Sequence, residues 1–184
     1  MKAGFYSVTL FFLLALATSV HAEEPKGFLK WPWGTPVDDL VQDDSWCRFQ
    51  TKKVDRDKKT IYCSVYQIGD IKVNGLTLFF EPSNALTGYL IAAESNAFAA
   101  MRTTTIDKFG RPTSTETNQF RTRIGVLVPG EQLLWRWPSG TTASLSNMPR
   151  LPLPMMFLSV YTKVLDDIEE KKAEATKQKR REGF

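Results

Sequence analysis

Histidine is almost missing from this sequence. The chain has one, His21, at the end of an N-terminal stretch with the features of an export signal. Lys2 gives the stretch a positive start, residues 5–17 are almost all apolar, and Val20-His21-Ala22 places small residues where a signal peptidase reads them. The apolar run is too short for a membrane span. We therefore expect residues 1–22 to be a signal peptide and the mature chain to begin near Glu23.

Removal of His21 would leave a mature chain without histidine, and so without an imidazole metal ligand, general base or nucleophile partner. Adjacent carboxylates such as Asp38-Asp39 and Asp166-Asp167 usually point to different sides of a helix. Asp55-Arg56-Asp57 lacks the central Gly and the closing Glu of a calcium loop. We predict a protein that is not an enzyme and that uses no cofactor or metal. An envelope hydrolase that uses carboxylates or a Ser/Lys pair is the alternative.

Cysteine is scarce as well, with two residues, Cys47 and Cys63, both in the expected mature chain. An exported chain with an even number of cysteines is expected to form disulfides. Residues 46–53 and 59–67 alternate in polarity around a polar turn, which predicts an antiparallel hairpin with Cys47 opposite Cys63. The sequence therefore predicts a structural bridge between them, which contributes about 3 kcal/mol to stability.

A strong charge of one sign and long apolar runs are also missing after the signal. The net charge of the full chain, +4, is small and the two signs are interspersed. The basic isoelectric point therefore does not indicate nucleic-acid binding. Residues 151–165 are apolar, but Pro152 and Pro154 interrupt them, which argues against a membrane span there. We expect no nucleic-acid partner and no membrane span. The oligomeric state is left open.

What the sequence does contain is a regular succession of short helices and strands. Thr35-Pro36-Val37 predicts a helix start with a Thr cap, and Gly110 predicts a helix end. Asn74-Gly75 and Pro129-Gly130 are turn signals. The predicted elements are a helix over 35–44, strands over 46–53, 59–67, 76–80 and 86–93, a helix over 95–109, strands over 117–128, 132–137, 141–147 and 155–161, and a charged helix from residue 162.

The order of these elements, a helix and four strands twice over, predicts an α+β fold with an antiparallel sheet and helices on one face. We expect a single α+β domain over residues 23–162, with two possible subunits at 28–94 and 95–162. A C-terminal helix with a basic tail is expected over 163–184.

Two short motifs carry a resemblance to small bacterial envelope proteins. Trp33-Gly34 followed by Thr35-Pro36-Val37-Asp38-Asp39-Leu40 resembles the opening of those proteins, and Phe109-Gly110-Arg111-Pro112 is similar to the end of their helix. The tandem helix-plus-four-strand order resembles the β-lactamase-inhibitor-protein-like architecture. This resemblance implies protein binding and an accessory role in the envelope, and it carries over no individual binding residue.

Tryptophans and a basic tail are the candidate recognition features. Four of the five tryptophans form two pairs with a spacing of two residues, so each pair projects to one side of an extended segment. Large aromatics and Arg are enriched at binding hot spots, whereas core packing is the alternative for the tryptophans and a solvated helix end is the alternative for the tail. We assign Trp135 and Trp137 to the core and expect exposure of Trp31 or Trp33. The candidate partner-binding residues are Trp31, Trp33, Trp135, Arg136, Trp137, Lys179, Arg180 and Arg181.

These features together predict an exported protein, periplasmic or alternatively extracellular, that works by binding. We expect its partner to be another envelope protein, which it serves as an accessory, assembly or inhibitor module. A glycan or small-ligand binder that uses the tryptophans is a further alternative.

Overall fold

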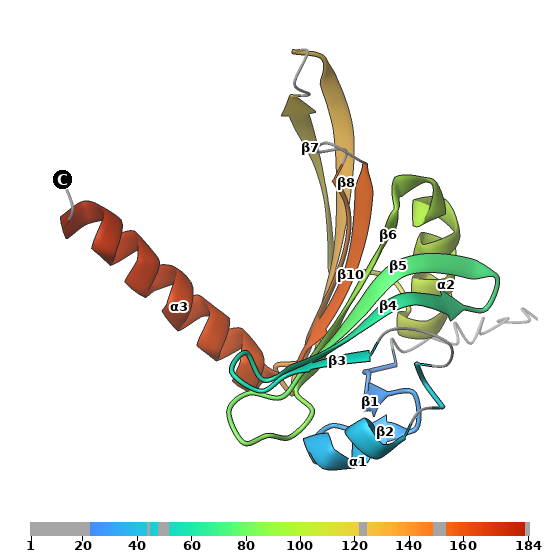
Figure 1. Cartoon of the computed structure of the whole chain (residues 1–184). Coiled ribbons are helices and arrows are strands. Elements are labelled where there is room, and N and C mark those ends of the chain that lie inside the picture. Colours follow the sequence, from blue (N-terminus) through green and yellow to red (C-terminus); the bar gives the residue numbers. More distant parts are fainter. Residues whose placement is uncertain (1–22, 44, 48–51, 122–124, 149–153, 183–184) are drawn as a thin grey trace, which may run out of the picture.

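The computed structural model describes residues 23–43, 45–47, 52–121, 125–148 and 154–182, and the predicted signal peptide lies outside them. An eight-stranded sheet occupies the centre of the protein and twists strongly from edge to edge (Figure 1). Its neighbouring strands are antiparallel. The α+β class and the antiparallel sheet predicted from the sequence are therefore confirmed.

The elements include a hairpin that is not predicted from the sequence. A short hairpin of β1 (Gly27–Phe28) and β2 (Trp31–Pro32) opens the chain. The helices are α1 (Val37–Gln42), α2 (Phe98–Phe109), which follows the 3-10 turn η1 (Ser95–Ala97), and α3 (Lys163–Glu182). The sheet strands are β3 (Lys52–Asp55), β4 (Thr60–Ile68), β5 (Ile71–Phe79), β6 (Gly88–Glu94), β7 (Ser114–Arg121), β8 (Leu127–Arg136), β9 (Thr142–Met148) and β10 (Met155–Tyr161).

The strands lie side by side in the order β3-β4-β5-β6-β10-β9-β8-β7. Two meanders therefore meet in the middle of the sheet, where β6 pairs with β10 and Ile91 lies opposite Leu158. The outer strands are β3 and β7. This order places residues from both halves of the chain next to one another on the central strands.

One side of the sheet, which we call the covered face, carries the core. The register aligns a row of buried side chains across five neighbouring strands, namely Leu76, Ile91, Leu158, Leu145 and Leu133. Buried residues of α2, α1 and the N-terminal hairpin belong to the same core. Figure 1 shows α2 along this side of the sheet, with α1 and the hairpin below it. The aliphatic strand residues and the apolar positions of α2 thus bury each other, as a two-layer fold requires.

The helix ends follow the sequence signals in part. Gly110 ends α2 with a φ of 74°, and its N–H donates to the carbonyl oxygen of Ile106, as the glycine signal predicts. The predicted Thr cap of α1 is wrong. The capping residue is Pro36, and the hydroxyl of Thr35 donates instead to the carbonyl oxygen of Pro32 at 2.8 Å. Thr35 is hydrogen-bonded in the turn before the helix, so its hydroxyl does not reach the first helical turn.

The predicted disulfide is present, but the predicted hairpin register is wrong. Cys47 and Cys63 are bonded, with their Cα atoms 6.0 Å apart. Across the ladder, however, Cys63 pairs with Lys52, so the register differs from the predicted one by five residues (52 against 47). A disulfide needs only nearby Cα atoms, not a shared rung of the ladder. The bridge therefore joins the segment before β3 to β4, and residues 48–51 between them lie outside the described residues.

Two predicted turns are also wrong, because strands continue through them. The single strand predicted over 117–128 is divided between β7 and β8, and Pro129-Gly130 lies inside β8 with Pro129 opposite Gln119. The β8–β9 pairing covers Gln132 to Arg136 only, so β8 lacks a β9 partner at Pro129 and tolerates the missing N–H. Likewise Asn74-Gly75 lies inside β5, and the turn before it is at Gly69-Asp70.

The third helix leaves the body of the protein. Figure 1 shows α3 on the side of the sheet opposite to α2, with its axis diverging from the strands. Leu165 in its first turn is buried, whereas the side chains of residues 170–178 are exposed. The predicted placement of helices on one face is therefore not confirmed.

Candidate functional site

The predicted tryptophans lie mainly in or against the core. Trp135 is 1% exposed, and its Nε1 donates to the carbonyl oxygen of Gly110 at 2.9 Å. Trp137 is half-buried and meets Phe109 edge to face, with 5.7 Å between ring centroids. The assignment of Trp135 and Trp137 to the core is thus confirmed, with Trp137 only partly covered.

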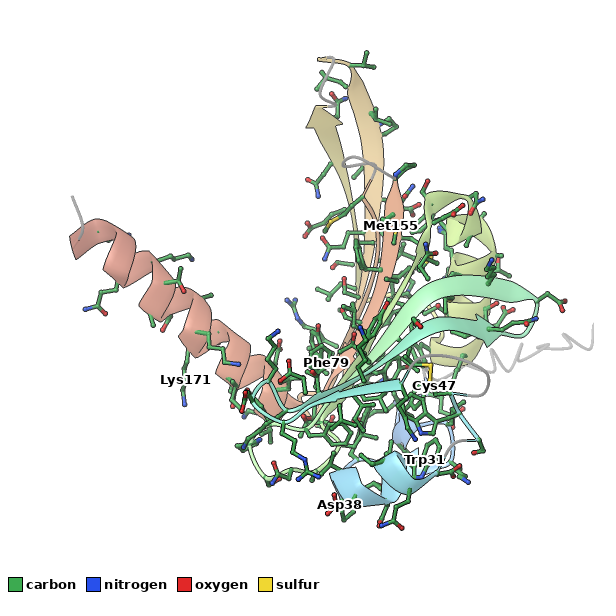
Figure 2. The ribbon with its side chains drawn as sticks, viewed as in Figure 1. Trp31, Asp38, Cys47, Phe79, Met155 and Lys171 are labelled. Carbon is green, nitrogen blue, oxygen red and sulfur yellow. A yellow bond between two sulfur atoms is a disulfide. The ribbon has the colours of Figure 1, made fainter. Side chains whose placement is uncertain are left out.

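The expected exposure of Trp31 is wrong. Trp31 is 8% exposed and stacks on Phe28 with 6.4 Å between centroids, because the β1–β2 hairpin folds onto the covered face (Figure 2). Trp33 is half-buried, and its Nε1 donates to the carbonyl oxygen of Pro25 at 2.7 Å. The apolar residues on both flanks of the two-residue turn Leu29-Lys30 are the signal from which this burial could have been predicted.

The predicted basic and arginine candidates lie elsewhere. Arg136 is exposed at the end of β8, on the opposite side of the strand from Trp135. Arg181 is exposed near the end of α3, while the side chains of Lys179 and Arg180 lie outside the described ones. Lys171 points into solvent from α3 (Figure 2). The structure therefore does not bring the eight predicted residues together in one site.

A different surface stands out: the side of the sheet that α2 does not cover, which we call the open face. Side chains alternate across a strand, so the neighbours of the buried rows point to this side. The register gives three rows. They are Tyr62, Thr77, Leu90, Ser159, Ser144 and Leu134; then Phe79, Gly88, Tyr161, Thr142 and Arg136; then Gly75, Ala92, Phe157, Ser146 and Gln132.

The side chains of the open face are only partly shielded. Leu90, Phe157 and Leu134 are half-buried although they are large and apolar, and Tyr62 is 38% exposed. On β4–β6 and β8–β10 every residue of the three rows except Arg136 is uncharged, whereas the register continues the rows onto the outer strands at Lys53, Asp55 and Glu116. The polar members are hydroxyl and amide groups, and the amide nitrogen of Gln132 donates to the hydroxyl of Ser144 at 3.0 Å. The centre of the open face is thus an uncharged surface of rings, aliphatic groups and hydroxyls, with charged residues at its edges.

The start of α3 closes the lower end of this face. The rings of Phe79 and Tyr161 meet edge to face, 5.7 Å apart, on either side of Gly88. A Cβ on Gly88 would lie 2.8 Å from Cδ2 of Leu165, so the first turn of α3 packs directly on the backbone there. Farther along α3, Lys172 forms an ion pair with Glu81 at 2.9 Å. These contacts fix where the helix leaves the sheet.

Sequence reasoning missed the open face, although a signal exists. An antiparallel sheet with one face in water normally alternates apolar and polar residues. In β10 both sets of positions are apolar, since Phe157 and Tyr161 lie on one side and Leu158 and Val160 on the other. In β6, the adjacent residues Leu90 and Ile91 likewise place one apolar side chain on each face of the sheet. Apolar residues on both faces indicate a second surface that favours cover.

The N-terminal segment is held against the opposite side of the molecule. The carboxylate of Glu24 accepts hydrogen bonds from the hydroxyls of Ser139 and Thr141 in the β8–β9 turn, the latter at 2.7 Å. Lys30 forms an ion pair with Asp43 at 2.5 Å. Hydrogen bonding from Lys30, and then from Ser45, holds the pKa of Asp43 well below its usual value. These contacts attach the segment to the β8–β9 turn at Glu24 and to the end of α1 at Lys30.

No described part of the site points to a metal or a membrane. Within residues 23–182, as far as they are described, no group of three or more His, Cys, Asp or Glu side chains gathers as for a metal ion. No helix in the same ranges is both long and apolar enough to cross a membrane. Comparison of the chain with protein-family models, with curated proteins and with solved structures found no match.

Proposed function

We propose that this protein is an exported, non-catalytic binding protein of the cell envelope and that its partner is another protein, which docks on the open face. The proposal makes it an accessory, assembly or inhibitor module. It extends the prediction from the sequence by moving the docking surface from the tryptophans to the uncovered side of the sheet.

The observation that carries the proposal is the half-buried apolar row on the open face. Leu90, Phe157 and Leu134 lie on three different strands of one continuous surface, and among the described residues no helix covers it beyond the first turn of α3. A soluble protein rarely exposes a wide apolar surface without a partner. Docking would remove these side chains from water, at about 25 cal/mol per Å² of apolar surface.

The chemistry of the surface favours a protein partner. Protein interfaces are enriched in aromatic residues and Arg and depleted in Lys, Asp and Glu at their centre. The open face has Tyr62, Phe79, Phe157 and Tyr161 inside and Arg136 at the margin, with hydroxyl groups between them. A nucleic acid would need a basic surface, which these neutral rows do not provide. A tryptophan-based glycan site is disfavoured because Trp31 and Trp135 are buried.

Localisation rests on separate observations. The Cys47–Cys63 disulfide favours an oxidising compartment such as the periplasm, with the extracellular space as the alternative. The sequence features of residues 1–22 favour export. An enzyme that uses carboxylates or a Ser/Lys pair on envelope substrates remains the rival class, which turnover measurements on peptidoglycan, ester and peptide substrates would distinguish.

We also propose that the two halves are related structural units, as in the β-lactamase-inhibitor-protein-like architecture. The first would be α1 with β3–β6 and the second α2 with β7–β10. The sheet order supports the proposal, because it runs from the first to the fourth strand of one unit and then from the fourth back to the first of the other.

The experiment that tests the docking surface compares partner capture by a double variant, a control variant and the unchanged protein. Purified protein with Tyr62→Ala and Phe157→Ser together should lose a partner that the unchanged protein captures from envelope extract. Leu127→Ser is the matched control, because Leu127 is 52% exposed but lies outside the three rows. Cross-links from the captured partner should map to the open face. Equal capture by all three proteins, or cross-links confined to the covered side, would contradict the proposal.

A further inference from the structure

A small apolar cavity lies beneath the β1–β2 hairpin, on the side of the sheet away from the open face. Its volume is about 110 Å³, and its walls come from the hairpin, the sheet and α2. Phe28, Tyr89, Ile91, Met101 and Leu158 are among the lining residues. An apolar cavity of about 150 Å³ holds benzene, so this one has room for about four carbon atoms.

A second cavity of about 320 Å³, with a more polar lining, adjoins the first. The two share Gly27, Leu29, Lys108 and Phe109 as lining residues, so they lie on either side of the hairpin turn. The outer cavity opens to solvent and is lined by the three lysines Lys26, Lys30 and Lys108.

Two of these three amines are available to a ligand. The third, Lys30, already forms an ion pair with Asp43. In the described part of the chain, neither Lys26 nor Lys108 has a carboxylate within ion-pair distance. Two acids, Glu23 and Glu24, also line the outer cavity. The carboxylate of Glu24 already accepts hydrogen bonds from Ser139 and Thr141, so Glu23 is the acid whose charge would oppose a bound anion. The Nζ of Lys108 lies 5.8 Å from the centroid of the Phe109 ring, beside the boundary of the apolar cavity.

The residue between the two cavities has an unusual backbone. Leu29 has a φ of 53° in the two-residue turn of the hairpin, a left-handed region that Gly occupies readily and that is unfavourable for residues with a Cβ atom. Its side chain is 62% exposed. Conformations of this kind occur often at ligand sites, where the surrounding structure maintains them. Here the ladder pairs of Gly27 with Pro32 and Phe28 with Trp31 maintain the turn.

We propose that the two cavities form one binding site for small anions with a short apolar end, such as straight-chain carboxylates. The apolar end occupies the inner cavity under Leu29. The carboxylate lies in the outer cavity, where Lys26 and Lys108 bind it. This site shares no residue with the three rows of the open face, so its test is independent of the proposed protein partner.

The test is an NMR titration of the purified protein with butanoate, hexanoate, octanoate and decanoate. Affinity should rise about four-fold per methylene up to hexanoate, as burial of a CH₂ group requires, and then level off when the inner cavity is full. The amides of Gly27, Leu29 and Lys108 should shift. Hexan-1-ol, which has no charge, should bind about three- to five-fold more weakly than hexanoate at low salt.

Matched variants separate the two halves of the site. Lys26→Gln and Lys108→Gln should each lower the affinity for hexanoate about three- to five-fold and leave the affinity for hexan-1-ol unchanged. Lys53→Gln on β3 should change neither affinity. Thr104→Leu, at the wall of the inner cavity, should weaken both ligands, whereas Thr103→Leu on the same helix should not. The side chains changed in these variants are all exposed, so the variants should fold. Affinity that does not depend on chain length, or equal losses with Lys53→Gln and Lys108→Gln, would overturn the proposal.

Discussion

The indole Nε1 of Trp135 donates a hydrogen bond of 2.9 Å to the carbonyl oxygen of Gly110, which connects the C-terminal end of β8 to the residue that ends α2. The same ring meets Phe109 edge to face at 6.0 Å. Trp135 therefore holds the second helix on the sheet both by packing and by a buried polar contact.

Replacement of this ring should be costly. We expect Trp135→Ala to lower the free energy of unfolding by about 3–5 kcal/mol, because it leaves a large cavity and an unpaired buried carbonyl oxygen. Trp33→Ala should cost less, since Trp33 is only half-buried. Urea denaturation of the two variants measures the difference. Equal, small losses for both would show that the core assignment is wrong.

Removal of the disulfide should also destabilise the protein. The bridge encloses residues at a sequence separation of 16, for which the chain-entropy description gives about 3 kcal/mol. Cys47→Ser should therefore lower the unfolding free energy by about that amount, and so should reduction of the unchanged protein. Non-reducing peptide mapping should link the two cysteine peptides. Two free thiols in the folded protein would contradict the bridge.

Processing of the N-terminus is testable directly. We expect mass spectrometry of the protein from its native envelope to show a chain that begins near Glu23, because residues 1–22 have the pattern of a signal peptide. Recovery of the envelope protein with Met1 intact would contradict export by this route. It would also restore His21 to the list of candidate catalytic residues.

Much of the fold could be predicted from the sequence because local signals agree with tertiary packing. Gly110 ends α2 as its backbone freedom predicts, and the predicted strands over 141–147 and 155–161 match β9 and β10 within one residue. The errors come from signals that are only local. Pro129-Gly130 has the composition of a turn, yet it lies within β8 because β9 does not pair with that part of the strand.

The candidate site was harder to predict than the fold. The sequence predicts exposure of Trp31 or Trp33, which precede the first helix and flank Pro32, but the hairpin places Trp31 against Phe28 and Trp46 in the core. Conversely, Phe157 and Tyr161 lie in a strand that reads as wholly buried. Which side of β10 stays uncovered depends on where α2 packs, and no pattern within β10 itself contains that information.

The ion pair between Lys30 and Asp43 should make stability depend on acid pH. A carboxyl group whose pKa is lowered by folding stabilises the protein above its ordinary pKa of about 3.9, and this contribution is lost as the pH falls toward the lower folded value. We expect the urea midpoint of the unchanged protein to fall more steeply below about pH 4 than that of Asp43→Asn. High salt should reduce the difference, since the pair is at the surface. Identical pH profiles would contradict it.

Gly88 should control how α3 leaves the sheet. A Cβ at this position would lie 2.7 Å from Cδ1 of Tyr161, 2.8 Å from Cδ2 of Leu165 and 2.8 Å from the backbone oxygen of Val160. The backbone oxygen cannot move aside, so Gly88→Ala should cost about 1–3 kcal/mol and loosen the first turn of α3.

The matched control for this substitution is Gly75→Ala in the neighbouring strand. A Cβ on Gly75 would lie 2.8 Å from the ring of Tyr62, but that side chain is 38% exposed and can rotate away. Hydrogen exchange should therefore become faster in residues 163–170 with Gly88→Ala and remain unchanged there with Gly75→Ala. If both variants leave exchange in α3 unchanged, the contact between Leu165 and the open face does not fix the helix. In that case α3 is held by the ion pair between Lys172 and Glu81 instead, and Lys172→Gln should accelerate exchange along the helix.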